Sequence, residues 1–151
     1  MGASDWNYCT PYQPDLNAAL RTLRERVFAE GAYHWPPESD FTPEHMRRPR
    51  PRTLEELDAA FEDDWQVQEA GTHSILDMER VIGPDDLPEP GTVQPVSPDD
   101  ARLLAGTEQL TRAHLDAVWE LADERWVGRC VVLHDDEGRP SEVCFWGYSG
   151  D

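Results

Sequence analysis

The sequence predicts a single α+β domain, in which a mainly antiparallel sheet with a C-terminal β-hairpin carries helices packed on one face. A chain of 151 residues is long enough for one domain with a real core and too short for two ordinary ones. The predicted elements run helix, helix, strand, strand, helix, helix, strand, strand, an order typical of α+β folds. The last two strands, Val127 to His134 and Val143 to Tyr148, flank a run of turn residues and form the hairpin.

The N-terminal part predicts an arm followed by a helix. Residues 1–14 are rich in aromatic residues and proline, and we expect an extended arm packed on the body of the domain. Asp15 begins a helix whose apolar stripe includes Leu20, Leu23 and Val27. Gly31 is placed to end this helix as its C-terminal cap.

Residues 33–52 predict a long loop rich in proline and arginine. The loop ends with Arg47, Arg48, Arg50 and Arg52, which alternate with prolines. One interpretation is a surface loop held to the acidic body by ion pairs, and the other is a recognition segment in polyproline II form. We treat the four arginines as candidate binding residues. If a partner uses this segment, replacing all four with Ser should weaken binding and leave the melting temperature unchanged. If the loop is structural, the same replacement should lower the melting temperature.

The middle of the chain predicts a second helix and then an ambiguous segment. Thr53 to Glu56 has the form of a capping box, and the apolar edge that follows, through Phe61 to Trp65, places Trp65 in the core. The far side of this helix is heavily acidic, and Gly71 ends it. Residues 73–82 fit either period, but their position between two glycine-containing turns favours a strand.

The last third predicts a strand, two helices and the hairpin. Thr92 to Val96 is a short strand, and Ser97 caps a helix that stops at Gly106. A long amphipathic helix follows from Thr111 to Trp126. Both faces of the hairpin strands carry apolar residues, which indicates strands inside the sheet that are covered on both faces for part of their length.

The three cysteines are expected to be reduced thiols. Their number is odd and the sequence has no CxxC pair, which fits a cytoplasmic protein. Pairing Leu133 with Ser141 places Cys130 opposite Cys144, and we expect two buried thiols there rather than a disulfide or a metal pair.

The net charge excludes several classes of partner. The chain carries 31 acidic residues and 13 bases, all of them arginine, for a formal charge of -18. Such a charge disfavours direct binding to nucleic acid or anionic membranes, because both require phosphate groups to be neutralised by basic residues. Cationic proteins and metal ions remain as electrostatic partners. We expect neither a signal peptide nor a membrane span, because no suitable apolar run is present.

The sequence contains no recognisable catalytic, cofactor or metal motif. The acidic clusters lack the spacing of a calcium loop, and the five histidines lack zinc-ligand spacing. We therefore predict no metal and no cofactor. His73, Ser74 and Asp77 are the candidate catalytic set, because they offer a base, a hydroxyl and a carboxylate. On a strand, however, His73 and Asp77 lie about 13 Å apart.

The six tryptophans invite a binding interpretation at the C-terminus. Trp146 and Tyr148 share one face of the last strand, and that face is exposed if it lies beyond the cover of the helices. The other interpretation places Trp146 in the core.

Four segments together resemble small, acidic, uncharacterised proteins of actinobacterial type. They are Gly71 to Asp77, Gly91 to Val96, Glu124 to Trp126 and Phe145 to Asp151. This resemblance implies a bacterial source and assigns no activity and no catalytic residue.

Two functions remain after these exclusions. The first is a non-enzymatic acidic protein that binds a cationic protein partner, in the manner of an immunity protein, an antitoxin or a DNA-mimic inhibitor. The alternative is a small enzyme or small-molecule-binding protein with a pocket near His73, Asp77 and Trp146. A convex acidic face favours the first function, and a closed apolar pocket that contains His73 favours the second.

Overall fold

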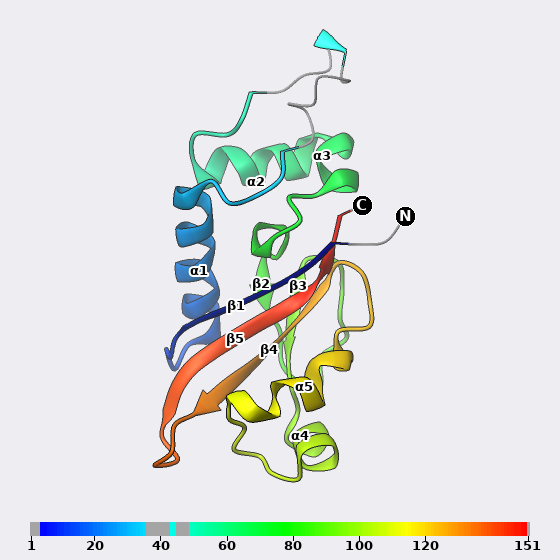
Figure 1. Cartoon of the computed structure of the whole chain (residues 1–151). Coiled ribbons are helices and arrows are strands. Elements are labelled where there is room, and N and C mark those ends of the chain that lie inside the picture. The colour runs from blue at the N-terminus through cyan, green and yellow to red at the C-terminus, as the bar shows by residue number, and fades with distance from the viewer. Residues whose placement is uncertain (1–3, 36–42, 45–48, 151) are drawn as a thin grey trace.

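The fold is a single α+β domain built on one open sheet (Figure 1). The computed structural model describes residues 4–35, 43–44 and 49–150. Within these residues the strand order is β1-β5-β4-β3-β2. The strands are β1 (Ser4–Pro11), β2 (Arg80–Val81), β3 (Thr92–Pro95), β4 (Val127–His134) and β5 (Pro140–Ser149). The long strands β1, β5 and β4 pair antiparallel, whereas the short strands β3 and β2 run parallel to β4.

The predicted C-terminal hairpin is confirmed and occupies the inner positions of the sheet. β4 lies between β5 and β3, and β5 lies between β1 and β4. The turn is held by Asp135, whose carboxylate accepts hydrogen bonds from the backbone N–H groups of Glu137 and Arg139. Gly138 occupies the left-handed region at φ 77°, where glycine has no steric penalty. The hairpin therefore closes through a loop longer than two residues, as its composition predicts.

The helices form where local caps and apolar stripes predict them. They are α1 (Leu16–Glu30), α2 (Leu54–Asp63), α3 (Trp65–Ala70), α4 (Pro98–Ala105) and α5 (Leu115–Val118). The Asp15 side chain caps α1, and Gly31 ends it at φ 65°. The Ser97 side chain accepts a hydrogen bond from the Asp100 N–H at the start of α4. These local signals are confirmed.

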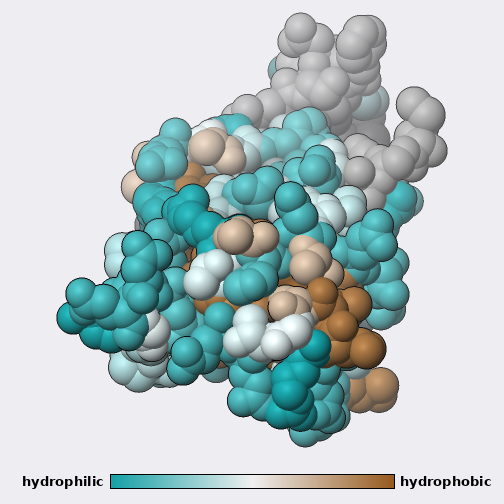
Figure 2. All heavy atoms as spheres, turned by 60° about the horizontal axis from the view of Figure 1, so that its bottom comes forward, coloured by the Kyte–Doolittle hydropathy of each residue, from teal (hydrophilic) through white to brown (hydrophobic). Residues whose placement is uncertain are grey.

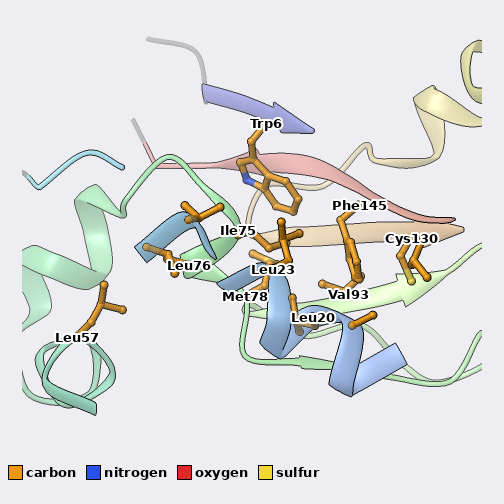
Figure 3. Close-up of a cluster of buried hydrophobic side chains, with 13 residues drawn as sticks. Trp6, Leu20, Leu23, Leu57, Ile75, Leu76, Met78, Val93, Cys130 and Phe145 are labelled. Atoms are coloured by element: carbon orange, nitrogen blue, oxygen red, sulfur yellow. The ribbon is translucent and has the colours of Figure 1, made fainter. Parts of the chain in front are cut away.

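Helices cover both faces of the sheet rather than the one face expected. On one face, α1 packs Leu20 and Leu23 against a cluster that includes Val93, Cys130 and Phe145 (Figure 3). On the other face, α4 and α5 contribute to a cluster with apolar side chains of β4 and β5, which are Val131, Leu133, Cys144 and Trp146. Because the side chains of each strand alternate between faces and both sets are apolar, each face needs its own cover.

The N-terminal arm is a strand of the sheet. β1 pairs with β5 from Ser4, opposite Ser149, to Pro11, opposite Glu142. Trp6 is buried at 4% exposure under this pairing. The pairing joins segments from opposite ends of the chain, so no local pattern indicates it.

The strand predicted over residues 73–82 is wrong in most of its length. Ile75–Asp77 is a 3₁₀ helix capped by the Ser74 hydroxyl, and only Arg80–Val81 pairs as β2. His73 has a positive φ of 54°, which turns the chain before the 3₁₀ helix. The apolar alternation reflects burial of this irregular segment under α1 and α2.

The long helix predicted from Thr111 to Trp126 is replaced by short helical turns. α5 spans one turn and is flanked by 3₁₀ helices at Arg112–His114 and Trp119–Leu121. Trp126 takes a positive φ of 72°, and its backbone bonds to Tyr148 and Gly91 at the ends of neighbouring strands. The apolar residues of this segment therefore pack against the sheet from short helical turns and not from one continuous helix.

The cysteines pair differently from the expectation. Leu133 lies opposite Glu142, which shifts the hairpin by one residue and sends Cys130 and Cys144 to opposite faces. Cys144 instead forms a disulfide with Cys9 of β1, with a Cα–Cα distance of 4.1 Å. Cys130 is a buried free thiol, and burial raises its pKa to about 12. The expectation that the three cysteines are reduced thiols is therefore wrong for Cys9 and Cys144 and holds for Cys130.

The surface is mostly hydrophilic, with a few exposed apolar side chains. Figure 2 shows the end of the molecule that carries α4, where apolar atoms gather at one side of a hydrophilic face. In α4, Leu103 and Leu104 are exposed at 80% and 43%. Among the described residues, no helix has the length and apolar character that crossing a membrane requires.

Candidate binding site

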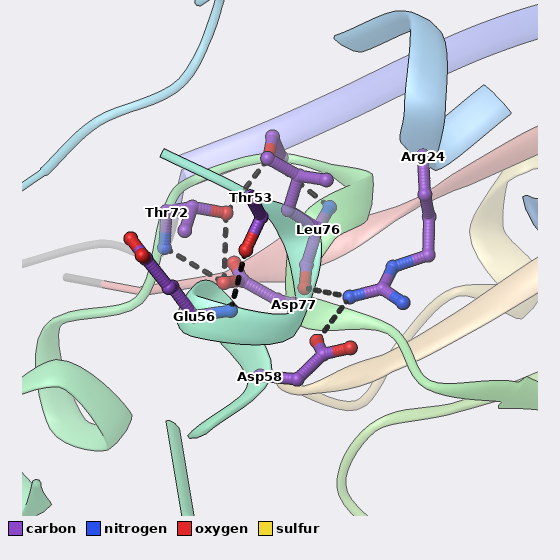
Figure 4. Close-up of polar contacts among 8 residues, drawn as sticks. Arg24, Thr53, Glu56, Asp58, Thr72, Leu76 and Asp77 are labelled. Atoms are coloured by element: carbon purple, nitrogen blue, oxygen red, sulfur yellow. Dashed lines mark hydrogen bonds and ion pairs between the residues drawn. The ribbon is translucent and has the colours of Figure 1, made fainter. Parts of the chain in front are cut away.

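Asp77 is a structural carboxylate that ties three parts of the chain together. Its oxygens accept hydrogen bonds from the Thr72 backbone N–H at 2.7 Å and from the Thr72 hydroxyl at 2.9 Å (Figure 4). They also accept a hydrogen bond from the Ser149 hydroxyl. Ser149 in turn accepts a hydrogen bond from the indole N–H of Trp6. Burial raises the pKa of Asp77, while these hydrogen bonds act in the opposite direction. The network joins the segment after α3 to β5 and β1.

His73 and Ser74 do not form a triad with Asp77. The His73 Nδ1 lies 3.2 Å from the Ser4 hydroxyl, and its Nε2 lies 3.1 Å from the Ala70 carbonyl oxygen. The Ser74 hydroxyl is used in a contact with Thr72 and as a cap for the 3₁₀ helix. Among the described residues, neither ring nitrogen of His73 has Ser74 or Asp77 as a hydrogen-bond partner. A base, a hydroxyl and a carboxylate are therefore near in sequence but not linked for nucleophilic catalysis.

His73 belongs instead to a pair of stacked histidines. The ring of His34 stacks on it, with the ring centroids 4.5 Å apart. Burial lowers the pKa of His34, and the charges of His73 and Arg50 add to this effect. The pair packs the segment after α1 against the segment after α3.

Trp146 lies in the core on the other side of the sheet. Its side chain is 1% exposed, it stacks on Trp119, and its indole N–H donates to the Trp119 carbonyl oxygen at 3.0 Å. Tyr148 is half-buried and packs on the same cluster. Trp146 therefore offers no exposed binding surface, and it does not line a pocket with His73 and Asp77. The alternative function stays a prediction without an assembled site.

The four arginines of the Pro/Arg-rich loop have different environments. Arg47 and Arg48 lie outside the described residues. The Arg50 guanidinium donates to backbone carbonyl groups at the end of α1 and lies 4.4 Å from the centre of the Tyr33 ring. Arg52 is exposed, and its contact is through the backbone N–H. Arg50 thus has a structural role that the sequence interpretation of a recognition segment did not include.

A corner between α2 and α3 creates a site that sequence reasoning missed. Thr53 caps α2, which ends at Asp63 because the next residue, Asp64, has an extended backbone that breaks the helix. The Asp64 carboxylate then accepts from the Gln66 N–H at 3.0 Å and caps α3. Because the helix restarts there, Trp65 is turned outward and is 66% exposed, so its predicted core position is wrong. An aspartate before a new apolar run was the available sequence signal for this second cap.

The corner borders a hollow of about 590 Å³, which we call the α2–α3 hollow. Trp65 lies at this hollow, and the buried Trp35 lines it together with Pro49 and Pro51. The remaining lining residues come from α2, α3 and the corner between them: Glu56, Ala59, Ala60, Asp63, Asp64 and Gln66. The hollow therefore combines aromatic and proline surfaces with carboxylates.

The helical segment beside the hollow is strongly acidic. Residues 54–70 contain seven acidic residues and no base. Among the lining residues, Glu56 accepts a hydrogen bond from the Arg52 backbone N–H, and Asp63 is exposed. Arg24 of α1 approaches α2 and pairs with Asp58 at 2.6 Å (Figure 4). An aromatic ring beside several carboxylates is suited to a guanidinium or ammonium group.

Metal-ligating residues gather elsewhere. Among the described residues, the donor set that could hold a metal ion consists of Cys9, Glu142 and Cys144 on β1 and β5.

The carboxylate of Asp77 borders a second cleft, of about 320 Å³, that Glu79 and Trp126 line. Since the Asp77 oxygens already accept three hydrogen bonds, that cleft is a weaker candidate for ligand binding than the α2–α3 hollow.

Comparison with known proteins does not assign this chain to a family. No protein-family model matches the sequence, and no curated protein or solved structure matches it. The resemblance to acidic actinobacterial proteins stays a prediction.

Proposed function

We propose that this chain is an acidic interaction protein that binds a cationic protein partner through the α2–α3 hollow. The observation that carries the proposal is the exposed Trp65 beside the carboxylates of Glu56, Asp63 and Asp64. The class of protein that fits is an inhibitor of a basic partner, in the manner of an immunity protein or antitoxin.

The chemistry of the hollow selects arginine over other side chains. A guanidinium group stacks flat on an indole ring and also bonds to carboxylates through two parallel N–H donors. Such a contact with Trp contributes about 0.5 to 2 kcal/mol, depending on how far water is excluded. The ammonium group of lysine supplies the charge but neither the planar stacking nor the two-pronged hydrogen bonding. The partner surface is therefore expected to present arginine.

The net charge of -18 favours the diffusional encounter with a basic partner and does not by itself determine which partner binds. A strongly negative protein attracts a basic partner over roughly a Debye length, which is about 8 Å at physiological ionic strength. Such steering raises the association rate and weakens with salt. Specificity must come from a local feature, and Trp65 supplies one.

The test uses two peptides of equal charge as probes. Hexa-arginine and hexa-lysine are titrated into the full chain by calorimetry at low and physiological salt. We expect tighter binding of hexa-arginine, and Trp65→Ala should weaken it by about 30-fold, the loss typical of a tryptophan hot spot. The matched control is Leu103→Ala, which removes a side chain that is also largely exposed but lies in α4.

A second pair of variants separates local from general electrostatics. Glu56→Gln with Asp63→Asn removes two charges at the hollow, and Asp85→Asn with Asp136→Asn removes two from exposed loops. Only the first pair should reduce binding strongly. Equal loss from both pairs, or equal affinity for the two peptides, means that binding follows net charge alone, and the proposed site is then wrong.

A further inference from the structure

Two cysteines and a glutamate share one face of the β1–β5 pair. Cys9 lies directly opposite Cys144, and their Cα atoms are 4.1 Å apart. Glu142 precedes Cys144 by two residues in β5, so its side chain leaves the strand on the same face. One donor atom from each of the three residues lies within 4.8 Å of the others.

The structure holds the two sulfurs as a disulfide, but the strand pairing does not depend on that bond alone. β1 and β5 pair continuously over eight residues. A dithiol reductant transfers two electrons and two protons to the disulfide, which yields two thiols while the reductant becomes a cyclic disulfide. The sheet then keeps both thiols and the carboxylate together. In a reducing compartment this set is a ready group of metal ligands.

We propose that the reduced chain binds a thiophilic divalent cation of the Zn²⁺ class through the Cys9 and Cys144 sulfurs and the Glu142 carboxylate. In a tetrahedral zinc site with Zn–S bonds of about 2.3 Å, two sulfurs lie about 3.8 Å apart. Directly opposed residues have Cβ atoms about 4.5 to 5.5 Å apart, so side-chain rotation brings the sulfurs to that separation. The fourth position is open to water or to an external ligand.

The surroundings of the three ligands fit a cation. Cys144 is buried at 3% exposure, whereas Cys9 and Glu142 are half-buried, which leaves access from one side. The Arg112 guanidinium bonds to both Glu142 oxygens, at 2.7 and 3.3 Å. Each carboxylate oxygen keeps a second lone pair for a metal, so Arg112 orients the ligand from the outer shell. Metal binding releases the two thiol protons to the solvent. The resulting two thiolates, one carboxylate, the dication and Arg112 sum to zero charge.

The disulfide and the metal exclude each other, because both use the same two sulfurs. Metal binding therefore protects Cys9 and Cys144 from oxidation and from alkylation. Cys130 is a buried thiol on the opposite face of the sheet and takes no part. This difference provides an internal control within the same molecule.

The experiment titrates Co²⁺, as a spectroscopic probe, into the full chain after reduction by a phosphine and removal of the reductant without oxygen. We expect a sulfur-to-cobalt charge-transfer band that saturates at one equivalent and disappears when Zn²⁺ is added. Glu142→Gln and Cys9→Ser should each weaken Co²⁺ binding by more than about 100-fold, since loss of even an outer-shell partner costs about 10- to 100-fold. Cys130→Ala should leave the band unchanged.

A second measurement needs no variant. With Zn²⁺ present, iodoacetamide should label Cys9 and Cys144 of the reduced wild-type chain at least tenfold more slowly, as read by peptide mass spectrometry, while labelling of Cys130 should not change. The proposal is overturned if the reduced wild type gives no charge-transfer band, if Cys9→Ser keeps it, or if Zn²⁺ gives no protection.

Discussion

Replacing Arg50 with Ser should destabilise the folded chain, although the sequence of its loop is also compatible with a recognition segment. The Arg50 Nη1 donates to the Gly31 carbonyl oxygen at 3.2 Å, and Nη2 donates to that of Tyr33 at 2.8 Å. Its guanidinium lies over the Tyr33 ring, which in turn stacks on Phe28 of α1. The side chain therefore connects the loop to the C-terminal end of α1, where a cation is favoured by the helix dipole.

The magnitude follows from these contacts. A hydrogen bond from a charged donor contributes about 1.5 kcal/mol at the lower end of its range, and the Gly31 bond contributes less because it is exposed. The cation–π contact adds about 0.5 kcal/mol at a partly exposed site. We expect the free energy of unfolding to fall by about 2 kcal/mol, which lowers the melting temperature of a domain of this size by about 4 to 8 °C.

The matched control is Arg52→Ser. Arg52 is exposed and donates to Glu56 only through its backbone N–H, which the substitution preserves. Both variants change the net charge equally, so general repulsion cancels in the comparison. Thermal and urea unfolding should separate them by several degrees. If Arg50→Ser melts within a degree of Arg52→Ser, the loop is not held by Arg50, and its role is better sought in binding.

Three further predictions concern the core, the buried carboxylate and metal removal. Trp65→Ala should leave the melting temperature within about 1 °C, whereas Trp146→Ala should cost about 3 to 5 kcal/mol in urea unfolding, because Trp146 alone of the two is buried; similar losses would contradict the assigned exposures. The pKa of Asp77 is raised above its ordinary value of 3.8, so the folded state holds a proton that the unfolded state has released, and stability should fall as the pH rises from about 4 through the raised pKa. Urea unfolding across that range should show a flatter profile for Asp77→Asn, which does not titrate, and an unchanged slope would refute this assignment. The oxidised chain should keep its melting temperature in excess EDTA, because its cysteine ligands are sequestered in the disulfide; a drop of several degrees would reveal a different metal site.

Local chemistry made part of the fold predictable. Asp15, Gly31 and Ser97 mark helix ends through contacts within a few residues, and such contacts are visible in sequence. The hairpin was predictable for the same reason, because its strands and turn are adjacent in the chain. The pairing of β1 with β5 was not predictable, because it joins residues far apart in the chain. Cys9 and Cys144, which it places opposite each other, are 135 residues apart.

The candidate site was less predictable than the fold. Trp65 continues the apolar period of α2, so a helix without interruption would bury it. The structure exposes it because Asp64 ends one helix and caps the next. The proximity of His73 and Asp77 in sequence was misleading, because a positive φ at His73 directs the two side chains to different partners.

The proposed binding site can be tested most directly through the six tryptophan indole groups, each of which gives its own N–H signal in a ¹⁵N-labelled chain. Hexa-arginine added to the labelled protein should shift the Trp65 signal progressively and to saturation, while the buried Trp6 and Trp146 signals stay in place. Trp65→Ala identifies the signal by its loss. If the Trp65 signal stays fixed while the peptide binds, or if hexa-lysine moves it equally, the α2–α3 hollow is not the binding site.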